Sequence, residues 1–192
     1  MRQRGFSLPE LLIAIAILLL GFAIALPRFK AFTVDANLVA AADRFKVEFR
    51  KARSMAIRSG VYTAIRFEEG PRGRPMFSVY RDGNYNGVRS ADIRTGRDQR
   101  IVGPLRLDAG LGGVRVAIHP GTPEPPPGRG ALDPSDPIRF GRANMLSFSP
   151  IGTATAGTFY LAGDGGQAGV RVTPASSRVR VLLYRHGRWS IR

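Results

Sequence analysis

The residues Phe6-Ser7-Leu8-Pro9-Glu10 open a stretch that continues as an unbroken apolar run from Leu11 to Leu26. At about 1.5 Å per residue, a helix over 6–26 is about 32 Å long, which is enough to cross a hydrocarbon core of about 30 Å. The stretch therefore predicts a transmembrane helix over residues 6–27.

The flanking charges give this helix an orientation. Arg2 and Arg4 precede the run and are expected to stay in the cytoplasm, although Arg28 and Lys30 on the far side reduce the asymmetry. A secretory signal peptide is one alternative, but its apolar core usually has about 7–15 residues and ends at a small-residue cleavage site. An ordinary single-span anchor is the other alternative.

Glu10 separates these alternatives, because it puts a carboxylate at the start of the apolar run. A charged side chain costs about 2.5–3.5 kcal/mol at the centre of a bilayer and less near the interface. A plain anchor gains nothing from this charge, so Glu10 indicates a segment with a further task.

The junction Gly5-Phe6, together with Pro9 and Glu10, resembles the leader motif of type IV prepilins. That resemblance implies that residues 1–5 are a leader peptide, which a prepilin peptidase removes after Gly5 before methylating the new amine of Phe6. It also implies that Glu10 pairs with the N-terminal amine of a neighbouring subunit during filament assembly. Pro9 falls in the first turn of the processed helix, where a missing N–H does little harm.

Helical periodicity resumes after Pro27, which is expected to kink or briefly interrupt the helix. Apolar side chains then recur at steps of three and four residues, which places them on one face of a helix. Gly60 follows Ser59 and is a stop signal. The sequence predicts an amphipathic helix over 28–60 with an apolar face made by Leu38, Ala41, Ala42, Phe45, Phe49, Ala52 and Ala56.

From residue 61 the apolar pattern has a period of two, which indicates strands. The expected fold class is α+β: a long N-terminal helix, transmembrane in its first half and amphipathic in its second, packed on an antiparallel β-sheet head over 61–192. The Pro/Gly-rich stretch 119–137 is expected to be a loop. Strands are predicted at 61–67, 75–81, 101–107, 114–118, 145–149, 158–161, 169–173, 178–184 and 189–191.

Two segments of the head resemble the GspH/FimT branch of the type IV pilin-like proteins. Residues 146–152 (Leu-Ser-Phe-Ser-Pro-Ile-Gly) look like its strand and turn before the last hairpins. Ser177-Arg178-Val179-Arg180 is similar to its C-terminal Gly-Arg-x-Arg motif, with serine in place of glycine. The resemblance implies a pilin-like layout and, in FimT-like pilins, associates arginines corresponding to Arg178 and Arg180 with DNA capture.

The composition limits the classes of partner and of activity that are expected. The formal charge of +15 falls to +13 without Arg2 and Arg4, which favours partners with anionic surfaces: nucleic acid, lipid headgroups or acidic proteins. The chain has no cysteine, so a periplasmic head relies on its core or on bound metal for stability. No serine lies in a nucleophile-elbow context. An enzyme is not expected.

The best-formed local motif of the head is Asp82-Gly83-Asn84-Tyr85-Asn86-Gly87, which matches the start of a calcium-binding EF-hand loop. Oxygen ligands from Asp82, Asn84 and Asn86 would surround a Ca²⁺ ion. Ile93 stands where the loop needs a bidentate Glu, so Asp92 is the candidate substitute. The alternative is an Asx-rich hairpin turn without a metal.

Arg178 and Arg180 are the candidate DNA contacts, because alternate residues of a strand share a face and guanidinium groups suit phosphates. The alternative is that both arginines only keep the surface soluble.

The leading hypothesis is a minor pilin or pseudopilin that needs no cofactor, spans the bacterial inner membrane once and displays its head in the periplasm. It would help initiate or cap a type II secretion pseudopilus or a type IV pilus. Expected partners are other pilin subunits, the prepilin peptidase, the inner membrane and a secreted protein. A DNA-binding minor pilin that acts in DNA uptake is the alternative.

Overall fold

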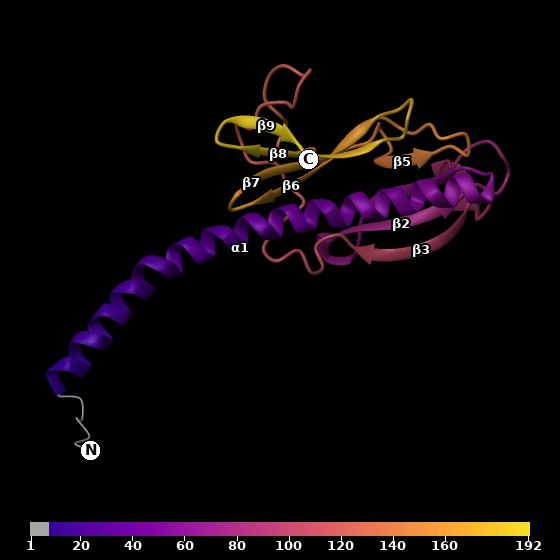
Figure 1. Cartoon of the computed structure of the whole chain (residues 1–192). Coiled ribbons are helices and arrows are strands. Elements are labelled where there is room, and N and C mark those ends of the chain that lie inside the picture. Colours follow the sequence, from indigo (N-terminus) through magenta and orange to yellow (C-terminus); the bar gives the residue numbers. More distant parts are fainter. Residues whose placement is uncertain (1–7) are drawn as a thin grey trace.

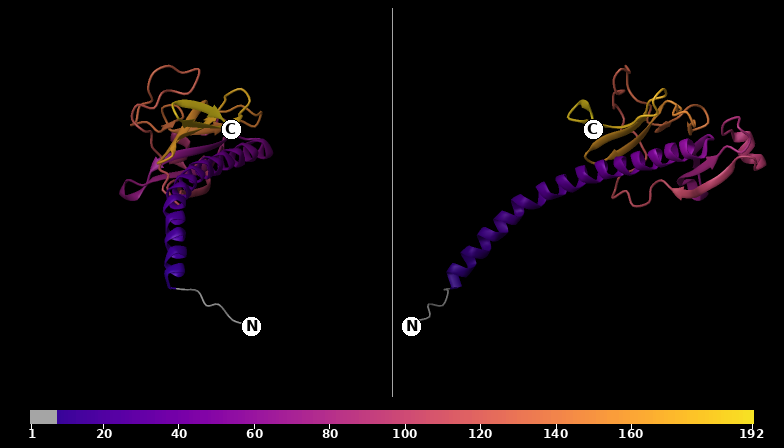
Figure 2. Two further views of the ribbon diagram at one scale, coloured as in Figure 1. Left: turned by 60° about the vertical axis from the view of Figure 1, so that its left-hand side comes forward. Right: turned by 45° about the vertical axis from the view of Figure 1, so that its right-hand side comes forward.

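In the computed structural model, the described residues are 8–192, without the side chains of residues 24–34. One long helix, α1 (Leu8–Ser59), leads from the N-terminal side into a head of short strands (Figure 1). The helix continues through Pro27, so of the two expected outcomes, a kink or a brief interruption, the interruption is wrong. Figures 1 and 2 show that the N-terminal half bends gradually away from the line of the second half.

Two antiparallel sheets form the head, and the predicted α+β class is confirmed. The first sheet has the order β3-β2-β1-β5 and the second has the order β4-β6-β7-β8-β9. The strands are β1 (Thr63–Glu69), β2 (Pro75–Arg81), β3 (Gln99–Arg106), β4 (Ile138–Arg139), β5 (Met145–Phe148), β6 (Gly157–Gly163), β7 (Gly166–Val172), β8 (Val179–Arg185) and β9 (Arg188–Ile191), with the short helices η1 (Pro71–Gly73) and α2 (Ser90–Thr95) between them.

The C-terminal half of α1 packs on both sheets, against β6, β7 and β8 of the second and β1 and β5 of the first. Every side chain of its predicted apolar face is buried, from Leu38 at 0% exposure to Ala56 at 0%. Gly60 adopts a left-handed φ of 68° and its N–H bonds to the carbonyl of Ala56 at 3.1 Å, which ends the helix as predicted.

Aromatic rings join the helix to the sheets at the centre of the core. Phe45 of α1 lies 4.5 Å from Phe159 of β6, and Phe49 lies 5.8 Å from Phe140 and 6.2 Å from Phe67 of β1, measured between ring centroids. These contacts fix the position of α1 across both sheets, because buried aromatic side chains contribute large apolar areas in specific orientations.

The predicted strand at 114–118 is wrong. Arg115 forms only an isolated bridge, in which its N–H and carbonyl bond to Ala162 at 2.8 Å each. The next backbone groups are met by a side chain: the buried Gln167 donates to the carbonyl of Ala117 and accepts from the N–H of His119, at 2.9 and 2.8 Å. A side-chain amide therefore takes the place of a neighbouring strand.

The sequence pattern does not predict helix α2, because its residues fall at the end of the candidate calcium loop. It begins after Arg89 and ends at Gly96, which has a left-handed φ of 76° and bonds back to the carbonyl of Ile93. This short helix of six residues directs the chain from the 82–87 loop into β3.

Candidate functional site

The first half of α1 presents apolar side chains to the surroundings on all sides. Leu12 is 58% exposed, Ile17 is 65% exposed and Phe22 is 61% exposed, and residues 8–23 are exposed throughout. Figure 2 shows this half extending well away from the head. None of the helices in the described part of the chain is both long and apolar enough to cross a membrane.

Glu10 lies in the first turn of α1 and is exposed among these apolar side chains. No ion pair joins it to another described residue. Its carboxylate lies at the positive end of the helix dipole, where a second positive charge from another chain would add to the attraction. The predicted processing residues Gly5 and Phe6 lie outside the described residues.

The loop 82–87 is organised around the buried carboxylate of Asp82, at the end of β2. Its two oxygens accept hydrogen bonds from the backbone N–H groups of Asn84 and Gly87, at 3.0 and 2.7 Å. Asn86 donates its side-chain amide to Asp92 at 3.2 Å. The structure therefore brings Asp82, Asn84, Asn86 and Asp92 into one hydrogen-bonded turn.

Asp98 completes this turn, and no sequence motif predicts its role. It is 2% exposed and accepts hydrogen bonds from the N–H groups of Gly83 and Arg89, at 3.1 and 2.9 Å. A lone Asp in the segment Arg97-Asp98-Gln99 carries no motif, so only the folded backbone reveals its partners.

The geometry of the turn resembles the metal-free alternative, since backbone N–H groups contact both oxygens of Asp82. Within residues 8–192, no group of three acidic, histidine or cysteine side chains is placed to hold a metal ion. Calcium binding by Asp82, Asn84, Asn86 and Asp92 stays a prediction.

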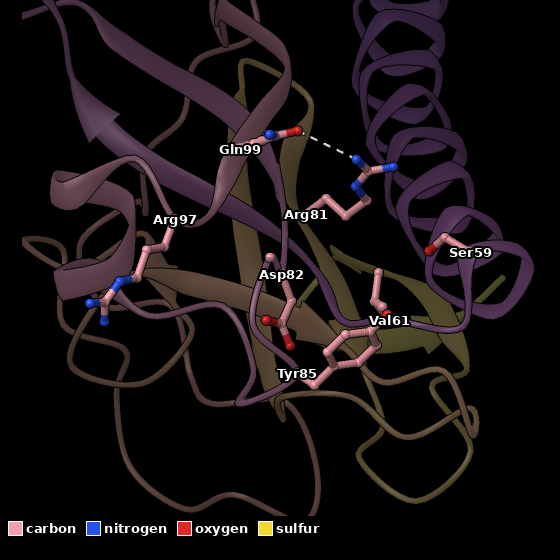
Figure 3. A pocket seen from close by; sticks show the side chains of 8 residues that line it. Ser59, Val61, Arg81, Asp82, Tyr85, Arg97 and Gln99 are labelled. Carbon is pink, nitrogen blue, oxygen red and sulfur yellow. Dashed lines mark hydrogen bonds between the residues drawn. The ribbon is translucent and has the colours of Figure 1, made fainter.

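A shallow hollow lies beside this turn at the end of α1 (Figure 3). Figure 3 shows Arg81 reaching toward Gln99, to which it donates a hydrogen bond at 3.4 Å, while Arg97 points the other way. Arg97 instead approaches Asp92 at 3.7 Å. Because the two guanidinium groups diverge, they do not form a site for one anion.

Arg178 and Arg180 lie on the outer side of the second sheet, since Val179 between them is buried in the core. Neither arginine forms an ion pair with a described residue. Ser177 takes a left-handed φ of 44°, the conformation that glycine would adopt without strain, and its buried hydroxyl has no hydrogen-bond partner among the described residues.

Comparison with known protein families gives two matches. A family model described as the prokaryotic N-terminal methylation motif matches residues 1–26, and one described as type II transport protein GspH matches residues 41–177. Searches of curated proteins and of solved structures gave no match.

Proposed function

Because the chain belongs to the GspH family of type IV pilin-like proteins, we propose that it is a minor subunit that helps initiate or cap a filament. The two family matches support a minor pseudopilin or pilin of a type II secretion system or a type IV pilus. GspH is a structural family rather than a family of enzymes. The role in initiating or capping the filament is supported by the first half of α1.

The observation that carries the proposal is the exposed apolar half of α1 with one carboxylate at its start. Such a surface is unfavourable in water, since each fully buried large apolar side chain contributes about 1.5–3 kcal/mol. A bilayer, followed by neighbouring helices in a filament, supplies the missing cover. The anchor consists of residues 6–27. It spans the inner membrane and leaves the head in the periplasm.

Assembly follows from the charge of Glu10. The prepilin peptidase cuts after Gly5 and methylates Phe6, and the new amine of one subunit pairs with Glu10 of its neighbour. Between helices, away from water, this pair selects the correct register, because an unpaired carboxylate there is unfavourable. Burial of the apolar surface supplies the affinity between subunits, and the ion pair of Glu10 fixes their register.

The test is incorporation of Glu10→Ala into filaments. Loss of one partner of a buried ion pair costs about 3–5 kcal/mol, so incorporation should fall by more than about tenfold. Glu69→Ala, which removes an exposed carboxylate of the head, is the matched control and should assemble normally. Mass spectrometry of the membrane fraction should find a chain that begins at methylated Phe6. Normal assembly of Glu10→Ala would overturn the proposal.

A second function, DNA binding during uptake, has one supporting observation: Arg178 and Arg180 lie on the outer side without an ion-pair partner among the described residues. Affinity for a short duplex at physiological salt should then fall when both become alanine, because each lost phosphate contact removes a favourable charge interaction. Unchanged affinity would exclude a specific role for the two arginines.

A further inference from the structure

The outer face of the second sheet carries a polar hollow beneath the proline-rich segment 123–128. Thr158 of β6 lies directly between Arg139 of β4 and Arg171 of β7 in the strand register, and Tyr160 follows on the same face. The hollow has a volume of about 340 Å³. These four side chains line it together with Glu124, Pro125, Pro127, Gly128, Ala156 and Gly157.

Neutral groups hold Arg171 in place. Its guanidinium donates to the backbone carbonyls of Pro126 and Pro125, at 2.7 and 3.2 Å, and to the hydroxyl of Thr158 at 3.4 Å. No carboxylate of the described chain forms an ion pair with it. Arg171 therefore contributes a positioned and uncompensated positive charge at the wall of the hollow.

A carboxylate of the chain itself already occupies part of the hollow. Glu124 bonds to the guanidinium of Arg139 at 3.0 Å, and Asp136 approaches the same group at 3.8 Å. This hydrogen bond with Glu124 raises the pKa of Arg139 above its ordinary value. The contact demonstrates that the geometry of Arg139 suits a carboxylate from the side of the proline-rich segment.

Tyr160 gives the hollow a buried polar wall. The residue is 2% exposed, and its ring lies against Gly169 of β7, where an added Cβ would come within 3.4 Å of the ring. Burial raises the pKa of the hydroxyl, although Thr158 and the charge of Arg139 oppose this effect. The phenol therefore remains protonated and available as a donor at neutral pH.

The uncompensated positive charge lies on the β7–β8 side of the hollow. Arg180 of β8 lies directly opposite Arg171, and neither forms an ion pair with a described carboxylate, whereas Glu124, Asp136 and Asp133 all interact with Arg139. The acids beside Arg139 repel a second and a third negative charge more than a first, which disfavours a dianionic phosphate. A single carboxylate matches this arrangement.

We propose that this hollow binds an acidic side chain of a partner protein, with Arg139, Arg171 and Tyr160 as donors and with Glu124 as an internal competitor. The incoming carboxylate takes the place of Glu124 on Arg139 and displaces the proline-rich segment from the sheet. The identity of the partner as a filament subunit or a secreted protein depends on the proposed function, whereas carboxylate binding by the purified chain does not.

Trp189 provides the measurement, because it is the one tryptophan of the sequence and its indole N–H donates to the carbonyl of Pro123 at 2.9 Å. The full chain in a non-ionic detergent is titrated with acetyl-Gly-Glu-Gly amide, which carries one carboxylate, and with acetyl-Gly-Gln-Gly amide as the uncharged control, at constant ionic strength. Displacement of the proline-rich segment should change the Trp189 fluorescence in a saturable way. No saturable change would overturn the proposal.

The variants are chosen so that their effects have opposite signs. Arg171→Gln and Tyr160→Phe should each weaken peptide binding by about tenfold, because each removes a hydrogen bond to a charged group. Glu124→Gln should tighten binding several-fold, because it removes the competitor. Tyr160→Phe keeps the buried ring, and circular dichroism melting should confirm that all variants are folded.

Arg142→Gln is the matched control, since it removes one exposed positive charge outside the hollow. An equal loss of peptide affinity in Arg142→Gln and Arg171→Gln would mean that general charge attraction explains the binding, which would overturn the proposal. Weaker peptide binding by Glu124→Gln would exclude competition between Glu124 and the peptide carboxylate. Stronger binding of inorganic phosphate or of a single-stranded oligonucleotide, with the same residue dependence, would overturn the carboxylate assignment. Glu10→Ala should bind the peptide normally, so failure of this site and failure of filament assembly are told apart.

Discussion

The two halves of α1 are both rich in apolar residues, yet their surroundings are opposite. In residues 8–23 the apolar side chains point in every direction, and Leu19 is 63% exposed. In the second half they form one stripe, and Phe49 is 1% exposed between the two sheets. A stripe can be buried by a single adjoining layer, whereas a helix that is apolar all round needs cover on every side. The head supplies the first kind of cover, whereas no other described part of the chain covers residues 8–23.

The largest expected effect comes from truncating the buried stripe. Phe49→Ala should lower the free energy of unfolding of the head by about 3–5 kcal/mol, because it leaves a cavity among Phe67, Phe140 and Phe159. Leu19→Ala in the exposed half should change it by less than about 0.5 kcal/mol. Urea denaturation of both variants in detergent measures the difference, and equal losses would contradict the division of α1 into two environments.

An intermediate effect of opposite sign is expected at Ser177, in the connection between β7 and β8. Ser177→Gly should raise the free energy of unfolding by about 1 kcal/mol, because it relieves the left-handed φ of 44° and removes an unpartnered buried hydroxyl. Thermal unfolding gives the shift, with Ser135→Gly in an exposed turn as the control. A lower melting temperature for Ser177→Gly would show that the serine contributes contacts that outweigh its strain.

The smallest effect is expected at the boundary between the halves. The guanidinium of Arg185 lies 3.5 Å from the carboxylate of Asp35 and donates to the Asp35 carbonyl at 3.2 Å, where α1 first meets the head. Asp35→Ala should cost about 0.2–1 kcal/mol, as for other partly exposed ion pairs. Hydrogen exchange should increase only in the helix around residue 35. Faster exchange throughout 38–56 would mean that this pair supports the whole stripe.

The periodic parts of the chain were the predictable ones. The stripe from Leu38 to Ala56 and the stop at Gly60 follow directly from residue spacing, and the structure confirms them. The strand predicted at 114–118 was wrong because the side chain of Gln167, distant in sequence, satisfies its backbone. Local pattern contains no information on such a partner.

The candidate site residues also fall into those that a local motif predicts and those that only the fold brings together. Asp82 and its asparagines were visible as a turn motif, but Asp98, which binds two backbone N–H groups of the same loop, was not. A sequence motif predicts Arg178 and Arg180 as candidate contacts, whereas the hollow between Arg139, Arg171 and Tyr160 depends on the register of three strands. Residues that act together through strand pairing carry no common spacing in the sequence.

The continuity of α1 has a mechanical consequence. A helix of 52 residues without a break is a rod of about 78 Å, so tension applied at one end reaches the head without passing through a hinge. The second half of the helix lies along the sheets, and axial load would therefore shear many core contacts at once instead of peeling them apart one by one. The curved first half can straighten under tension before that load reaches Phe45 and Phe49 (Figure 2).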